Sequence, residues 1–228
     1  MSYSINEVAG LIDHAVLKPE MTAADIKKDA AMCRARNVGD LCVRPCDVAL
    51  AVKELAGCET TIAAVIGFPH GSNRSQTKAL EAKLAIEDGA QELDMVMNIG
   101  KFLAGDDAYV QQDIEAVVAE AKPKGVLVKV ILETCRLTLE QVAHACKLAE
   151  AAGADYVKTS TGFNGAGATP EAIAVMVATV GSTMKVKASG GIRNWETAVS
   201  YLNQGCSRLG VGSAEAVLDG AESAGGAY

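Results

Sequence analysis

Two stretches of the chain, ADYVKTSTG (residues 154–162) and MKVKASGGIR (residues 184–193), indicate its fold. Each is a short apolar run with a lysine near its end, Lys158 or Lys187, and each then passes into small polar residues and glycine. The pattern is typical of short parallel strands, although lysine is almost never fully buried without a partner. Because side chains alternate along a strand, the valine before each lysine would face covering helices and both lysines would face the other side.

Strand-like and helix-like segments alternate along the whole chain. We expect strands at residues 11–14, 40–44, 61–68, 92–97, 126–133, 155–160, 185–189 and 208–212. Eight such repeats in 228 residues predict an α/β fold, the closed (β/α)8 TIM barrel, which usually takes about 250 residues. An open doubly wound sheet is the alternative, but the glycine-rich turn expected after its first strand is absent from residues 14–19.

Local signals mark the ends of the helices between these strands. Residues 22–25 and 138–141 resemble capping boxes, and Thr169-Pro170 places proline at a first helical position. Glycines are expected just after helix ends at positions 57, 89, 153 and 205. We therefore expect a single domain over residues 1–228, with a flexible tail from about residue 220.

Composition excludes several classes of function. The chain is 50% hydrophobic and only 4% aromatic, so its core must be aliphatic. A net charge of -7 argues against nucleic-acid binding, and no apolar run is long enough for a membrane span. The 7 cysteines form no CxxC pair, which favours reduced thiols in the cytoplasm. The three histidines lack metal-site spacing, so no metal is expected.

The C-terminal ends of barrel strands form the active site of such enzymes, and the two lysines lie there on neighbouring strands. A second ammonium about 6 Å away costs roughly 2.8 kcal/mol at an effective dielectric of ~20, which lowers a lysine pKa by about two. A neutral lysine is the nucleophile that forms a Schiff base with a carbonyl compound. The alternative is a pair of lysines that bind a carboxylate or a phosphate ligand.

Other strand residues extend this candidate site. Asp13 and Asp94 could shuttle a proton, or could only neutralise the lysines. Lys129 lies deeper in its strand, and we expect Asp94 to be its ion-pair partner. Cys42 would contact substrate or pack, because the sequence supplies no histidine partner for a catalytic thiol.

Three glycine-rich loops follow the last three expected strands, at residues 161–167, 189–191 and 210–213. Glycine lets backbone amides approach an anion closely, and the loops after strands seven and eight of a barrel often hold a phosphate. Tight strand–helix turns are the alternative interpretation.

Seven motifs follow one another along the chain: IDH (12–14), LCVRP (41–45), VIGFP (65–69), ELDMV (92–96), KVILET (129–134), KTSTG (158–162) and KASGG (187–191). Together they resemble the deoxyribose-phosphate aldolase family over nearly the whole chain. The resemblance implies a class I aldolase on a (β/α)8 barrel that needs neither metal nor cofactor. It would reversibly cleave 2-deoxy-D-ribose 5-phosphate to acetaldehyde and D-glyceraldehyde 3-phosphate, as a cytoplasmic homodimer.

The resemblance also implies roles for individual residues. Lys158 matches the Schiff-base lysine, Lys187 the second lysine that depresses its pKa, and Asp94 the proton-relay carboxylate. Tyr228 matches a terminal tyrosine that assists the proton step. Substrate contacts are expected from Asp13, Cys42, Thr159, Gly162, Gly190, Gly191, Gly212 and Ser213.

The chain departs from the family pattern around the expected phosphate site. The turn after strand eight has Val211 and Gly212 where the family has two hydroxyl residues, Phe163 replaces a lysine of some members, and Ala15 replaces a common threonine. We expect a higher KM for the phosphorylated substrate and a smaller preference over the free sugar. Two other functions stay open: an aldolase of another sugar phosphate, and a non-catalytic sugar-phosphate-binding barrel.

Overall fold

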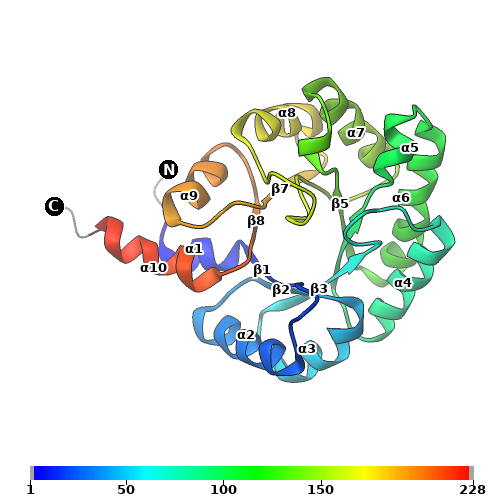
Figure 1. Ribbon diagram of the computed structural model, residues 1–228. Helices are drawn as coiled ribbons and strands as arrows, with labels where there is room; N and C mark the ends of the chain where they lie inside the picture. Colours follow the sequence, from blue (N-terminus) through cyan, green and yellow to red (C-terminus); the bar gives the residue numbers. More distant parts are fainter. Residues whose placement is uncertain (1–2, 226–228) are drawn as a thin grey trace.

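The computed structural model describes residues 3–225, which form a closed barrel of parallel strands in the order β1 to β8 (Figure 1). The strands are β1 (Ile12–Val16), β2 (Asp40–Val43), β3 (Thr61–Ile66), β4 (Glu92–Val96), β5 (Leu127–Ile131), β6 (Tyr156–Lys158), β7 (Lys185–Ser189) and β8 (Arg208–Val211). The barrel closes where β1 pairs with β8, with Asp13 opposite Gly210. The predicted (β/α)8 fold is confirmed.

Helices surround the strands on the outside of the barrel (Figure 1). They are α1 (Ile5–Gly10), α2 (Ala23–Arg36), α3 (Val48–Glu54), α4 (Ser75–Glu87), α5 (Ile99–Leu103), α6 (Asp107–Ala121), α7 (Leu139–Ala151), α8 (Pro170–Val180), α9 (Trp195–Asn203) and α10 (Ala214–Gly225). Three short 3-10 helices connect them: η1 (Pro45–Asp47), η2 (Lys122–Lys124) and η3 (Thr134–Arg136). Within residues 3–225, no helix is long and apolar enough to cross a membrane.

The predicted helix boundaries are confirmed at the level of hydrogen bonds. The Thr22 amide donates to the Asp25 carboxylate at 2.7 Å at the start of α2. The Thr138 amide donates to the Gln141 side chain at 2.9 Å, and the Gln141 amide donates back to Thr138 at 3.3 Å. Such reciprocal bonds pair amides that the first turn of a helix leaves without partners. Each glycine expected after a helix, at positions 57, 89, 153 and 205, has positive φ.

Strand alternation divides the side chains between two environments. Val157 and Val186 are buried in the aliphatic layer between strands and helices, as predicted. Lys158 and Lys187 are opposite each other in register and face the lumen of the barrel. Gly210 makes room for them, because a Cβ at this position would lie 2.7 Å from the Ser189 Cβ and 3.3 Å from the Lys187 Cε.

The structure differs from the expected segments mainly at their ends. β1 continues to Val16, two residues past the expected end, and β6 spans only Tyr156–Lys158. Helix α10 runs to Gly225, so the backbone is helical beyond position 220, where a tail was expected. Tyr228 lies outside the described residues.

Candidate active site

Eight ionisable side chains are brought together in the lumen, from seven different strands. They are Asp13, Asp40, Glu92, Asp94, Lys129, Lys158, Lys187 and Arg208. Most of them are almost completely buried. Buried charges persist when they are paired and hydrogen-bonded, and the contacts show how this pairing is arranged.

Asp94 on β4 is the carboxylate shared by the lysines. Its Oδ2 accepts hydrogen bonds from the Nζ atoms of Lys158 and Lys187, each at 2.7 Å. Its Oδ1 accepts one from Lys129 at 2.9 Å, which confirms the predicted ion pair between these two residues. Burial opposes the charge on Asp94, but the three lysines outweigh burial and hold its pKa well below the usual range. Asp94 is therefore ionised.

Asp13 on β1 is the second shared carboxylate. Its Oδ2 contacts the ammonium of Lys187 and lies 3.4 Å from that of Lys129, while Arg208 donates to its Oδ1 at 2.7 Å. Burial opposes ionisation here too, yet Lys187, Lys129 and Arg208 together lower the pKa of Asp13 to about 2. Asp13 thus holds Lys187 in place from the side opposite Lys158.

The same carboxylates act on the pKa of Lys187. Burial alone would lower this pKa, but Asp13 and Asp94 outweigh it and hold the pKa above its ordinary value. The sequence-based pKa argument rested on repulsion between the two ammonium groups and on burial, with neutralisation by Asp13 and Asp94 as the alternative. In the structure Asp94 bridges them, so each ammonium faces an opposite charge at 2.7 Å as well as its neighbour.

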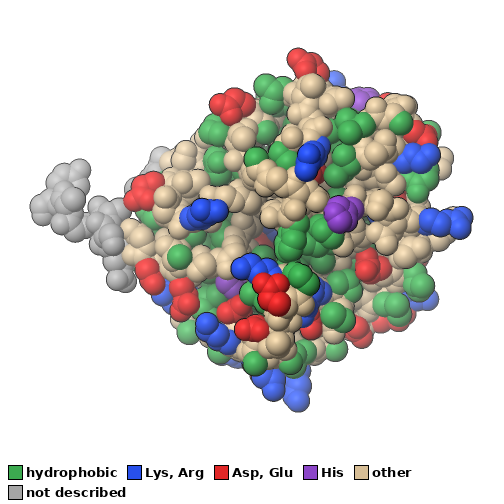
Figure 2. All heavy atoms as spheres, in the orientation of Figure 1, with side chains coloured by type: hydrophobic (Ala, Val, Ile, Leu, Met, Phe, Trp, Pro, Cys, Tyr) green, Lys and Arg blue, Asp and Glu red, His purple; other side chains and the backbone are tan. Residues whose placement is uncertain are grey.

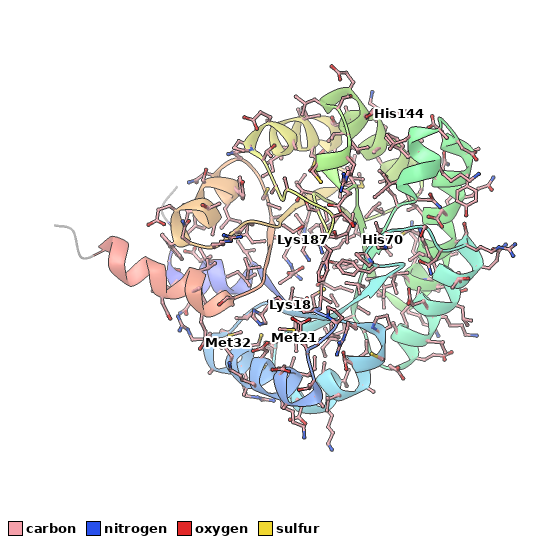
Figure 3. The ribbon with its side chains drawn as sticks, viewed as in Figure 1. Lys18, Met21, Met32, His70, His144 and Lys187 are labelled. Atoms are coloured by element: carbon pink, nitrogen blue, oxygen red, sulfur yellow. The ribbon has the colours of Figure 1, made fainter. Side chains whose placement is uncertain are left out.

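A cavity of about 630 Å³ opens above this cluster, at the C-terminal ends of the strands. Figure 2 shows the face of the molecule hollowed near its centre. Lys158, Lys187, Asp13 and Cys42 line the cavity. Figure 3 shows Lys187 near the middle of the barrel, with Lys18 and Met21 at one side of the opening. A substrate in the cavity would meet Lys158 at its floor.

All three predicted glycine-rich loops line this cavity. Gly162 comes from the loop after β6, Gly190 and Gly191 from the loop after β7, and Gly212 and Ser213 from the loop after β8. Ser213 precedes α10, and its hydroxyl accepts from the Ala216 amide at 3.4 Å. The loops therefore surround one end of the cavity with backbone amides and a helix N-terminus, an arrangement that favours an anion.

Thr159, a predicted substrate contact, does not line the cavity. Its side chain is fully buried, and its hydroxyl donates to the Ser189 carbonyl and accepts from the Ser189 amide, at 3.0 and 2.9 Å. Thr159 follows the inward-facing Lys158, so alternation turns it away from the lumen, and it joins the ends of β6 and β7. Val211 is buried in the aliphatic layer and also borders the cavity.

Cys42 lies in the cavity wall, and its thiol is not activated. Burial raises its pKa to about 12, with a further contribution from Asp94. Because the thiolate is the reactive form, Cys42 is unsuited to act as a nucleophile. Among the described residues, no group of three or more His, Cys, Asp or Glu side chains is placed to hold a metal ion.

Sequence reasoning missed three members of the charge cluster, Asp40, Glu92 and Arg208. It also missed two cations at the opening of the cavity, Lys18 and Arg193. Glu92 accepts two hydrogen bonds from Arg208 at 2.8 Å, and Asp40 is fully buried beside Thr61. Both acidic residues begin expected strands, so alternation along β2 and β4 could have placed them inside. Lys18 and Arg193 line the cavity from loops, where no periodic pattern marks them.

A (β/α)8 barrel with a cavity-lining lysine beside a carboxylate has the layout of a lysine-dependent barrel enzyme. The family model described as DeoC/LacD family aldolase matches residues 8–209. This chain therefore belongs to the DeoC/LacD aldolase family.

Named relatives and solved structures agree with this assignment. Deoxyribose-phosphate aldolase 2 of Bacillus licheniformis is 49% identical over 94% of this chain and 96% of its own length. A deoxyribose-phosphate aldolase of Clostridium perfringens is 48% identical over 94% and 95%. The structure of a putative deoxyribose-phosphate aldolase from Coccidioides immitis superposes with a TM-score of 0.93 at 39% identity, covering 97% of this chain and 88% of that one. The tetrameric deoxyribose phosphate aldolase of Aeropyrum pernix gives 0.88 at 31%, covering 97% and 93%.

Proposed function

We propose that this chain is a deoxyribose-phosphate aldolase that works through a Schiff base on Lys158. The observation that carries the proposal is the placement of Lys158, which lines the cavity while Asp94 contacts its amine from below. The substrate follows from the relatives, which carry this name at 48–49% identity over 94% of the chain.

The reaction begins at the amine of Lys158. The neutral amine adds to the aldehyde carbon C1 of open-chain 2-deoxy-D-ribose 5-phosphate, and loss of water leaves a protonated imine. A base takes the proton of the C3 hydroxyl, and the C2–C3 bonding pair moves toward the imine. D-glyceraldehyde 3-phosphate leaves, and the two remaining carbons stay on Lys158 as an enamine.

Completion of the cycle needs a proton at C2 and one water molecule. Asp94 and Lys187 supply the proton relay, because the Asp94 carboxylate touches both amines at 2.7 Å. Protonation of the enamine carbon regenerates an imine, and water then releases acetaldehyde and the free amine. The water lost in the first step is regained in the last.

The phosphate of the substrate would lie among the three glycine-rich loops at the far end of the cavity. Gly190, Gly191, Gly212 and Ser213 offer backbone amides and a hydroxyl there, and the N-terminus of α10 adds a favourable dipole. Asp13 holds Lys187, and Cys42 contributes to the cavity wall. Tyr228 keeps its proposed role in the proton step from the family resemblance.

Trapping tests this function directly. The protein is incubated with acetaldehyde, reduced with borohydride, and digested to locate the added mass. An adduct on Lys158 and release of acetaldehyde from 2-deoxy-D-ribose 5-phosphate are expected. An adduct spread over surface lysines, or none, would overturn the proposal, and a different aldehyde product would identify an aldolase of another sugar phosphate.

We further propose a single-domain cytoplasmic homodimer. All seven cysteines are free, including the exposed Cys46 and Cys135, which suits a reducing compartment. The Aeropyrum pernix relative is described as tetrameric, so the mass in solution decides between the two assemblies. Light scattering that gives twice the chain mass of 23.5 kDa would support the dimer, and four times that mass would overturn it.

A further inference from the structure

Glu133 is a buried acid that the proposed reaction does not use. It follows β5, is fully buried, and has φ 57° and ψ 60°. This left-handed conformation is costly for any residue other than glycine. Such an outlier persists only where its surroundings require it, so the side chain at position 133 has a function that glycine could not supply.

The backbone on both sides of Glu133 is fixed to β6. The Leu132 amide donates to the Lys158 carbonyl, and the Thr134 amide donates to the Thr159 carbonyl, each at 2.9 Å. These two bonds secure the chain immediately before and after Glu133. The turn between them directs the carboxylate toward the loop that follows Lys158.

Every hydrogen bond to the Glu133 carboxylate comes from that one loop, residues 159–169, which we call the β6–α8 loop. Oε1 accepts from the Thr161 amide at 3.2 Å. Oε2 accepts from the Thr161 hydroxyl at 2.5 Å and from the Asn164 side-chain amide at 2.9 Å. Among residues 3–225 the carboxylate has no ion pair, and its three donors all lie on the loop, so it acts as an acceptor that fixes the shape of the loop.

The contacts continue from Glu133 to the cavity wall. The Thr161 hydroxyl gives its single proton to Glu133 and accepts from the Phe163 amide at 3.1 Å. Asn164 also donates to the Pro69 carbonyl at 2.8 Å, and the Phe163 ring packs edge-on against Phe68 with centroids 5.1 Å apart. Thr161, Gly162 and Phe163 all line the cavity.

We propose that Glu133 is a positioning residue that holds the β6–α8 loop in the shape that binds the phosphorylated end of the substrate. Resting on the proposed function, this inference adds that Glu133 sets KM for the phosphorylated substrate and leaves Schiff-base formation at Lys158 unchanged. The residue acts through Thr161 and Asn164 and touches no reacting atom.

Glu133→Gln is the decisive variant, because it keeps the size and removes acceptors. One carboxylate oxygen becomes an NH2 group, so at least one of the three loop donors loses its partner in either orientation of the amide. Glu140→Gln is the matched control, since Glu140 is an exposed glutamate nearby in the first turn of α7. Asn164→Ala removes the hydrogen bond from Asn164 to the Glu133 carboxylate. It is the substitute test variant if Glu133→Gln does not fold.

Two measurements separate this role from a general structural one. Hydrogen exchange of the peptide covering the β6–α8 loop is expected to be about tenfold faster in Glu133→Gln and Asn164→Ala, with Glu140→Gln unchanged, since each lost bond is worth a factor of this order. KM for 2-deoxy-D-ribose 5-phosphate is expected to rise about tenfold, while borohydride-trappable acetaldehyde adduct forms at the wild-type rate.

The outcomes are distinguishable from failure of the proposed function. Unchanged exchange in the loop would overturn the inference even if the enzyme is an aldolase. Faster exchange with unchanged KM would also overturn it, and so would a fall in adduct formation that matches the loss of activity. If the wild type forms no adduct, the proposed function fails, and the exchange experiment still tests whether Glu133 holds the loop.

Discussion

Lys158 and Lys187 occupy paired positions on neighbouring strands, yet their surroundings differ. Lys187 is fully buried and donates to both Asp13 and Asp94, which hold its pKa above the ordinary value against the effect of burial. Lys158 is 4% exposed, lines the cavity, and within the described residues has Asp94 as its one ion-pair partner. The strand register brings both amines to the cavity, and the two amines differ in the number of carboxylates that contact them.

The difference explains which lysine is suited to attack a carbonyl. An ammonium held by two buried carboxylates loses its proton at high cost. Among the described residues, Lys158 has one carboxylate partner, and it lines the cavity. Lys187 is therefore suited to stay charged and to stabilise its neighbours. Lys158 is suited to alternate between free amine and imine.

The largest expected effect comes from Lys158→Ala. Covalent adduct formation requires this amine, so trapping with acetaldehyde and borohydride should give no adduct at position 158, and turnover should fall below detection. Lys185→Ala is the control, because Lys185 is exposed on β7 and should leave both unchanged. Turnover of substrate by Lys158→Ala would contradict the assignment of Lys158, rather than Lys187, as the nucleophile.

Lys187→Met should slow adduct formation at pH 7 by about a hundredfold. Loss of its positive charge leaves Asp94 to stabilise the ammonium of Lys158 more strongly, so proton release needs a higher pH. A neighbouring ammonium at about 6 Å is worth roughly two pKa units, and the pH profile of adduct formation should move upward by about that amount. Full activity at pH 7 would show that the two amines are not coupled.

Asp13→Asn should destabilise the fold by about 2 kcal/mol at neutral pH, because a folded pKa of about 2 lies below an unfolded value of ~3.9. The contribution of a lowered pKa is fully present above the unfolded value and is lost as pH falls toward the folded one. Urea unfolding should show a difference from wild type that is constant above about pH 5 and shrinks toward pH 2. Asp219→Asn, a surface substitution, should show little effect, and a difference independent of pH would contradict the ion-pair assignment.

The smallest effect is expected from Gly212→Ser, which leaves both lysines untouched. An added Cβ at position 212 would meet no atom within 4 Å, and a restored hydroxyl contact is worth about 0.5–1.5 kcal/mol. KM for the phosphorylated substrate should fall by up to about tenfold, while the free sugar is unaffected. Gly212→Ala is the control, since it adds the Cβ without the hydroxyl and should not lower KM.

The wild-type enzyme provides a further test of the weakened phosphate site. Its preference for 2-deoxy-D-ribose 5-phosphate over the free sugar is measured as the ratio of the two kcat/KM values. A preference above about 10⁴-fold, roughly 5.6 kcal/mol at 1.4 kcal/mol per factor of ten, would show that the missing hydroxyl at position 212 does not matter.

Most of the fold could be predicted because the relevant information is local. Apolar periodicity located all eight strands, and the caps at Thr22 and Thr138 marked helix starts that hydrogen bonds confirm. The inward direction of Lys158 and Lys187 followed from alternation alone. Strand ends were less accurate, because the last residues of a barrel strand are fixed by pairing with neighbours distant in sequence.

The site was only partly predictable for the same reason. Asp94 was expected to neutralise the lysines, but its contact with three of them depends on the stagger of β4, β5, β6 and β7. The left-handed turn at Glu133 has no sequence signal, since glycine or asparagine is usual in that conformation. Thr159 was counted as a substrate contact, although alternation from the inward-facing Lys158 turns it away from the cavity.

The protonation state of Asp40 sets the net charge of the whole cluster in the lumen. Burial raises the pKa of Asp40 well above its usual range, and Asp13 adds to the effect. Its Oδ2 lies 2.8 Å from the Thr61 hydroxyl, and its Oδ1 has no hydrogen-bond partner within the described part of the chain. Protonation of Asp40, which this raised pKa favours, leaves three carboxylates facing four cations in the lumen.

One surplus positive charge is thus confined in a poorly solvated space and shared among groups that touch one another. Protons in such a coupled set leave in macroscopic steps that cannot be assigned to one side chain. The proton balance of the barrel interior is then a collective quantity, adjustable from its base as well as from its mouth.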